Sequence, residues 1–334
     1  MPKKETEERM IEKYFNEYKK NKKIYGEKTI IVWQCGSFYE VYGRFNNEKQ
    51  IFIDDYFNDY LNFFHVEPAG KKIRLTQDNI TYSVFMHGYQ ASKEKKDYQR
   101  DRLVRVLTSE GYTVVVWDEV GLDSSGKKKI REEEGIYSPS CQFETFNKYD
   151  SKNAACYVIN TSSLKNKMPS IHFGCSIVDI NTGKINLFEH TIKKQNIHNP
   201  TIFNELERFN AIYNPIETII IHNYQDESKI QDIIQFADLH TDKIHKIDEN
   251  DKTDENSIIA NRCEDFTYIK NILLKFYEIK DYNFFMETTK LNDYSTATKS
   301  LCFILEWIWK HNANLTHKLQ TPNFENFQNK LYLG

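Results

Sequence analysis

The sequence lacks the features that mark membrane, secreted and metal-binding proteins. No apolar run approaches the roughly 20 residues that span a bilayer, and the first ten residues, MPKKETEERM, are charged instead of forming an apolar signal peptide. The six cysteines form no C-x-x-C pair and no recurrent spacing, which favours buried reduced thiols over a zinc site. We therefore expect an intracellular, soluble protein without a metal site.

An excess of positive charge is also missing. The formal net charge is -3, and basic residues outnumber acidic ones neither in 1–150 nor in 151–334. A nucleic-acid-binding domain is usually strongly basic, so any contact with nucleic acid must use a local patch. With 40% hydrophobic residues, 334 residues are enough for two domains with separate cores.

Hydrophobic periodicity predicts that the first domain is mixed α/β. Apolar residues at spacings of three and four over 10–18 predict a helix that ends at Gly26. Ile30 to Cys35 is a near-continuous apolar run, as expected of a buried strand, and Gly36 interrupts it. A further helix and then a strand, helix and strand are predicted in the segments 47–64, 79–89, 92–111 and 112–120.

A second apolar core begins near residue 151. The preceding residues 121–150 are polar and highly charged, which favours a linker. Two strands around the turn signal Asn181-Thr182-Gly183, then a helix and a buried strand, predict a second α/β domain over 151–250. Residues 251–334 are mostly helical in pattern.

One motif resembles a phosphate-binding loop. GLDSSGKK, residues 121–128, nearly matches G-x-x-x-x-G-K-[ST], but Lys128 stands where a hydroxyl must hold magnesium. The charged REEEG follows in place of an apolar helix. A solvated loop is therefore favoured over nucleotide binding.

A second motif raises metal-dependent nuclease activity as an alternative. Asp179 stands where ribonuclease-H-like folds carry their first metal-binding aspartate, on the opening strand of a hairpin. Two-metal chemistry needs several carboxylates at one site, and Asp232 and Asp238 lack the strand context that would aim them there. A hairpin aspartate that hydrogen-bonds its own turn is the favoured interpretation.

Two basic clusters could contact a phosphate backbone. Taken alone, each is favoured as a solvated face over a phosphate contact. The second cluster also contains Arg100, Arg102 and Arg105, and acidic residues at 94, 97 and 101 halve its charge. The residues that we retain as possible DNA-backbone contacts are Lys71, Lys72 and Arg74 in the first cluster and Lys93, Lys95 and Lys96 in the second.

Five stretches, in order, resemble the N-terminal part of the MutS family of DNA mismatch-recognition proteins. QCGSFYEVYG is similar to that family's G-D-F-Y-E-L-F motif and LTSEGYTVVVWDEV to its L-V-x-x-G-x-x-V-A-I-x-E-Q. EGIYSPSCQFE, FGCSIVDINTGKINLFE and ELERFNAIYNPIETIII follow the later motifs. The sequence departs from the family pattern at Ser37, which replaces the usual Asp, and at Asp118-Glu119, which replaces Glu-Gln.

The resemblance implies a domain order and a set of missing parts. It implies a mismatch-binding domain (1–120), a linker (121–150), a ribonuclease-H-like connector (151–250) and the start of a helical core (251–334). The DNA clamp, ATPase and dimerisation regions would be absent. We therefore expect no enzymatic activity of this chain, with ATP and magnesium needed only by the missing ATPase domain.

The resemblance also implies how Phe38 and Glu40 read DNA. Their spacing of two puts both side chains on one face of an extended segment, outward, while Tyr39 and Val41 pack inward. Phe38 would enter the minor groove of a duplex with a mismatch or small loop, and Glu40 would hydrogen-bond the displaced base and disfavour intact duplex. The alternative is a protein-interaction module that docks a MutL-type partner through the connector domain.

Overall fold

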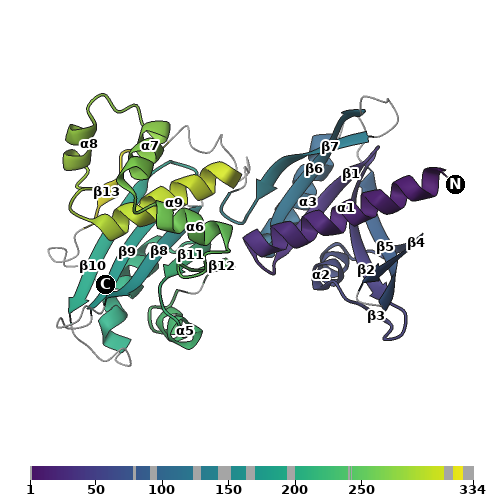
Figure 1. Cartoon of the computed structure of the whole chain (residues 1–334), viewed down its shortest axis with the longest axis horizontal. Coiled ribbons are helices and arrows are strands. Elements are labelled where there is room, and N and C mark those ends of the chain that lie inside the picture. The colour runs from purple at the N-terminus through teal and green to yellow at the C-terminus, as the bar shows by residue number, and fades with distance from the viewer. Residues whose placement is uncertain are drawn as a thin grey trace. The chain divides into compact units, whose positions relative to one another are not determined.

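The computed structural model resolves two compact units, residues 1–142 and 143–334, and we describe each by itself (Figure 1). The residues that it describes are 2–77, 80–90, 96–122, 129–141, 152–162, 170–193, 200–239, 241, 243–311 and 319–325.

The first unit is a mixed sheet with helices on both faces. Its helices are α1 (Pro2–Tyr25), α2 (Asp55–Phe64) and α3 (Lys96–Ser109). Its strands are β1 (Thr29–Cys35), β2 (Phe38–Asn46), β3 (Ile51–Phe52), β4 (Ala69–Gln77), β5 (Ile80–Gln90), β6 (Thr113–Leu122) and β7 (Lys129–Tyr137). The sheet order is β4-β5-β2-β1-β6-β7, with β3 beside β2 and only β1 and β6 parallel.

The predicted apolar run of β1 forms the centre of this sheet. Residues 29–33 are buried because α1 covers one face, where Tyr14 packs edge-on against Trp33 and Tyr42. On the opposite face α2 approaches so closely that a Cβ on Gly43 would collide with the Phe57 ring. The predicted end of α1 is confirmed, since Gly26 has the positive φ of 85° that glycine adopts at little cost.

The linker predicted over 121–150 is wrong for residues 129–137. These residues form β7, which pairs antiparallel with β6 inside the first sheet. The segment KIREEEGIY showed no apolar alternation because β7 is an edge strand with mostly exposed side chains. The first unit therefore extends beyond the expected boundary at residue 120.

The second unit is built on a sheet of order β12-β11-β8-β9-β10-β13. Its strands are β8 (Asn153–Ser162), β9 (Ser170–Asp179), β10 (Ile185–Lys193), β11 (Glu217–His222), β12 (Lys243–Asp248) and β13 (Asn323–Phe324). From β8 to β12 only β9 runs against the others. This is the ribonuclease-H-like arrangement, and the predicted fold class of two mixed α/β domains with following helices is confirmed.

Helices cover both faces of the second sheet. They are the short 3-10 helix η1 (Pro200–Phe203), α4 (Asn204–Tyr213), α5 (Glu227–Phe236), α6 (Glu255–Arg262), α7 (Phe266–Phe276), α8 (Tyr282–Thr288) and α9 (Ser295–His311). The helices η1, α4 and α5 share one core with Tyr157 and Phe173.

The start of a separate helical domain at residue 251 is also a wrong prediction. Helix α9 packs along β9, β8 and β10 (Figure 1). It meets Gly174, whose neighbour Phe173 packs in the core of α4 on the other face, so the helices complete the second unit. Contact is so close that a Cβ on Gly174 of β9 would meet the backbone of Thr296 and Ala297. The Ala297 amide also donates to Glu189 Oε2 at 2.8 Å, which fixes the N-terminus of α9 on β10.

Candidate nucleic-acid interface

The segment Gly36 to Glu40 forms the turn and second strand of a hairpin. Strands β1 and β2 are antiparallel, with Cys35 opposite Phe38 and Trp33 opposite Glu40. Gly36 has a φ of 61°, and glycine suits the first of the two turn residues because two-residue hairpins require positive φ there. The turn therefore presents Phe38 at the tip of the sheet.

The predicted alternation along Phe38-Tyr39-Glu40 is confirmed, but the predicted exposure holds for Phe38 alone. Phe38 is 40% exposed, whereas Tyr39 is buried and its hydroxyl donates to Asp118 Oδ1 at 2.9 Å. Glu40 is 7% exposed, so the expectation that it points outward is wrong. The segments that cover Glu40, α1 and β4, are distant from it in the sequence. The local sequence pattern therefore does not indicate its burial.

Glu40 is held by a hydroxyl and a cation. The Tyr42 hydroxyl donates to Glu40 Oε2, and Lys71 Nζ lies 3.9 Å from the same oxygen and 3.2 Å from Glu7 Oε1. Burial, together with Cys35 and Glu40, raises the pKa of Tyr42 well above its usual value, so this hydroxyl stays protonated and donates. Among the described residues, both contacts of the Glu40 carboxylate use Oε2.

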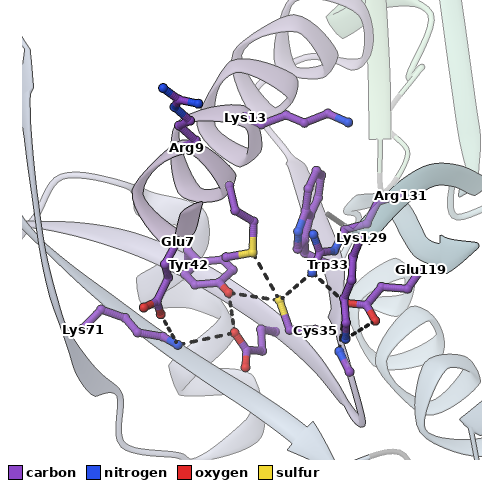
Figure 2. Close-up of a pocket in the computed structure, with 13 residues that line it drawn as sticks. Glu7, Arg9, Lys13, Trp33, Cys35, Tyr42, Lys71, Glu119, Lys129 and Arg131 are labelled. Atoms are coloured by element: carbon purple, nitrogen blue, oxygen red, sulfur yellow. Dashed lines mark hydrogen bonds and ion pairs between the residues drawn. The ribbon is translucent and has the colours of Figure 1, made fainter. Parts of the chain in front are cut away.

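An open pocket of about 620 Å³ lies between α1 and this part of the sheet (Figure 2). Glu40, Cys35 and Tyr42 line its floor, and α1 contributes Arg9 and Lys13. Five basic side chains line it against three acidic ones, the basic residues being Arg9, Lys13, Lys71, Lys129 and Arg131. The local patch is therefore positive although the chain as a whole has a formal net charge of -3.

Glu119 is a structural residue of this site that the sequence argument did not single out. Its Oε1 accepts from the Gly36 amide at 3.0 Å and lies 2.6 Å from Arg131 Nη2, and its Oε2 lies 2.7 Å from Lys129 Nζ. The sequence signal for this residue was the departure from the family pattern at Asp118-Glu119. Both acidic residues anchor the hairpin, Asp118 through Tyr39 on one face and Glu119 through the turn.

The basic residues proposed as DNA-backbone contacts lie in different environments. Lys71 is turned into the pocket and paired with Glu7 and Glu40, whereas Lys72 and Arg74 are exposed on β4, at the edge of the sheet. Lys93 and Lys95 lie outside the described residues, as does the side chain of Lys96 at the start of α3.

The Asp179 carboxylate accepts hydrogen bonds from its own hairpin turn in the second unit. Its Oδ1 accepts from the Asn181 amide at 3.0 Å and its Oδ2 from the Thr182 hydroxyl at 2.7 Å, which confirms the turn interpretation. Within the described ranges no group of three or more His, Cys, Asp or Glu side chains could hold a metal ion. Most of the phosphate-loop-like motif, residues 123–128, lies outside the described residues.

No family model matches the sequence. It is 25% identical over 336 residues to the putative DNA mismatch repair protein mutS homolog L359 of Acanthamoeba polyphaga mimivirus. The chain is thus similar to a MutS homologue over most of its length. The match covers 96% of this chain and 28% of the relative, so the chain spans little more than a quarter of that protein's length.

Two solved structures are distantly similar to the chain. Thermus thermophilus RuvC in complex with a Holliday junction substrate has a TM-score of 0.26 at 10% identity, covering 49% of this chain and 97% of that one. The family B DNA polymerase of Pyrobaculum calidifontis has a TM-score of 0.18 at 10% identity, covering 60% and 31%. No helix in the described part of the chain is both long and apolar enough to cross a membrane.

Proposed function

We propose that the first unit binds duplex DNA at mispaired or unpaired bases and that Phe38 acts as the wedge. The observation that carries this proposal is the placement of Phe38, a large apolar side chain that is 40% exposed on an anchored hairpin. A solvent-exposed aromatic ring on an anchored hairpin at the tip of a sheet suits insertion between bases.

The energetics favour deformable DNA. Wedging a side chain between base pairs costs a few kcal/mol of stacking and kinks the duplex. A mismatched step stacks weakly, so inserting a side chain there costs less free energy than inserting it at a matched step. The basic side chains of the pocket, with Lys72 and Arg74 on β4, supply attraction to phosphates that is independent of sequence.

The similar protein supports the same function. The mimivirus relative is named as a putative DNA mismatch repair protein, and 96% of this chain aligns with it. Because the chain spans 28% of that relative, we confine the proposal to DNA binding by the hairpin.

The test is fluorescence anisotropy with matched and mismatched duplexes at one salt concentration. We expect Phe38→Ala to reduce binding to the mismatch until the two affinities are equal. Phe284→Ala, which removes a phenylalanine that is 68% exposed in the second unit, is the matched control and should keep the preference. A mismatch preference that survives Phe38→Ala would refute the wedge.

Docking of a repair partner on the second unit is a second candidate function. Its large exposed apolar side chains concentrate in α6 to α9, among them Phe266 (63%), Phe284 (68%) and Trp309 (41%). Such side chains are enriched where proteins bind one another. In the full chain, Phe284→Asp should abolish capture of a MutL-type protein and leave DNA binding intact, with Phe38→Ala showing the reverse. Unchanged capture by Phe284→Asp would contradict this candidate.

A further inference from the structure

We propose that Ser170 and His172 act as nucleophile and base in the second unit and hydrolyse uncharged esters with an apolar acyl group. The site lies where β8, β9 and β10 pair with one another, and it uses no residue of the first unit. The inference is therefore independent of the proposed function.

The register of the second sheet brings four polar side chains together, which we call the serine–histidine cluster: Ser162, Ser170, His172 and Thr191. Ser162 of β8 is the Cα partner of Ser170 on β9, and Thr191 of β10 is the partner of His172. Partners on antiparallel strands share one face of the sheet, as do residues two apart on one strand. Thr191 is exposed and the other three are half-buried, so a substrate can reach the cluster from solvent.

The contacts within the cluster are those of an activated nucleophile. Ser170 Oγ lies 2.8 Å from His172 Nε2, and Thr191 Oγ1 lies 3.1 Å from Nδ1 of the same ring. In the assigned tautomer Nδ1–H donates to Thr191, which leaves the lone pair of Nε2 for the Ser170 hydroxyl. A hydroxyl within hydrogen-bond reach of an imidazole that a third group orients is the arrangement that nucleophilic catalysis requires.

The proton and the acyl group then follow a balanced path. Ser170 Oγ forms a bond to the acyl carbon while its proton passes to His172 Nε2. The Ser162 hydroxyl, whose oxygen lies 2.7 Å from Ser170 Oγ, turns to donate to the negative oxygen of the tetrahedral intermediate. The bond between acyl carbon and alkoxy oxygen breaks, and His172 protonates the departing alcohol. Water, activated by His172, hydrolyses the acyl-serine to the acid and restores the hydroxyl.

A cavity beside the cluster indicates the class of ester. Its volume is about 400 Å³, within the range of roughly 300–1,000 Å³ for sites that enclose small organic ligands, and Asn160, the Cα partner of His172, lines it. The large apolar side chains that line it are Phe266, Ile269, Met286 and Leu291. Lys299 and Glu264, which also line it, neutralise each other as an ion pair at 2.6 Å. An uncharged ester therefore suits this cavity better than a charged one.

The experiment measures release of 4-nitrophenol from 4-nitrophenyl acetate and 4-nitrophenyl butyrate by the whole chain. Peptide mass spectrometry of acid-quenched protein locates the acyl group. Ser170→Ala removes the nucleophile, His172→Gln the base and Ser162→Ala the donor to the tetrahedral intermediate. Ser228→Ala is the matched control, because it removes an exposed hydroxyl that donates to the Asp226 carboxylate, at 2.7 Å, instead of to an imidazole.

We expect the acyl group on Ser170 and no hydrolysis by Ser170→Ala beyond the uncatalysed reaction in buffer. His172→Gln and Ser162→Ala should each be slower than wild type by about a hundredfold or more, and Ser228→Ala should match wild type. The butyrate should react about tenfold faster than the acetate at equal low concentration, because two more methylene groups enter the apolar cavity.

An acyl group on any residue other than Ser170 would overturn the inference, and this result needs no variant. A wild-type rate equal to that in buffer, or unchanged hydrolysis by His172→Gln, would overturn it as well. Equal rates for acetate and butyrate would overturn the assigned class of ester. Phe38→Ala should hydrolyse the esters at the wild-type rate, so failure of the serine–histidine cluster and failure of the DNA wedge are seen in separate assays.

Discussion

The backbone amide of Gly36 donates to Glu119 Oε1 at 3.0 Å, which ties the tip of the β1–β2 hairpin to β6. The same oxygen lies 2.6 Å from Arg131 Nη2, and the Glu119 amide donates to Gln34 Oε1 at 2.8 Å. The position of Phe38 is thus set by a strand 83 residues further along the chain.

Removing the Glu119 side chain should loosen the hairpin. Glu119→Ala leaves the Gly36 amide without its acceptor, whereas Arg131 keeps the Gln34 carbonyl oxygen, which lies 2.6 Å from its Nε. A hydrogen bond to a charged group contributes about 2 kcal/mol. We expect the free energy of unfolding to fall by about 2 kcal/mol and mismatch preference to weaken. Glu119→Gln keeps an acceptor for Gly36 and should lose less. Urea unfolding checks the order, and equal stability of Glu119→Ala and wild type would contradict it.

Lys72 and Arg74 should contribute to DNA affinity without contributing to specificity. Both are exposed on β4, so replacing each by alanine removes a phosphate contact and lowers the slope of log affinity against log salt by about 0.9. Matched and mismatched duplexes should lose equally. Lys280→Ala, an exposed lysine of the second unit, is the control for nonspecific charge loss. A salt slope unchanged in the double variant would remove these two residues from the interface.

Gly174→Ala should destabilise the second unit. The new Cβ would collide with the backbone of Thr296 and Ala297, which cannot rotate away as a side chain can. Overpacking of this kind costs about 1–3 kcal/mol, and we expect the upper part of that range. Gly121→Ala is a matched control because its Cβ would meet nothing within 4 Å. The measurement is the midpoint temperature of thermal unfolding. An equal decrease of this midpoint in both variants would argue against the close packing.

The second unit should lose stability as the pH falls from about 6.5 to 4. Burial lowers the pKa of His311 to about 4, against about 6.5 in an unfolded chain. In that window the unfolded chain binds a proton that the folded chain does not, so unfolding is favoured by about 2 kcal/mol at pH 5 relative to pH 7.

The His311→Gln variant isolates this contribution. His311 Nδ1 lies 2.7 Å from the Trp307 carbonyl oxygen, a contact that the glutamine amide can replace without titrating. Urea unfolding at the two pH values should show a smaller difference for His311→Gln than for wild type. Identical pH dependence in the two proteins would refute the assignment to His311.

The elements that the sequence revealed are those whose periodicity reflects a buried face. Ile30 to Cys35 was predictable as a strand because both faces of β1 are covered, and α9 was predictable as a helix because nearly every side of it is apolar and buried. Which sheet α9 covers was not predictable, because its own pattern carries no information about its partner. The boundary at residue 251 failed for that reason.

Strands β4 and β7 were missed because most of their side chains are exposed. A strand at the edge of a sheet needs no apolar alternation, and a row of charged residues such as 131–134 then looks like a linker. The same limit applies to Glu40. Its burial involves Lys71, which lies near Glu40 and Glu7 only in the folded chain. The local sequence therefore indicated the face of the strand on which Glu40 lies but not its burial.

The stacking of Trp33 on Trp117 gives the first unit an optical signature. Their rings lie 5.2 Å apart at an interplanar angle of 29°, and Lys13 Nζ lies over both of them. Two indoles so arranged couple their electronic transitions and produce a near-ultraviolet circular dichroism signal that depends on their mutual orientation. Because Trp33 also lines the pocket, this circular dichroism signal can report ligand binding there in the unlabelled protein.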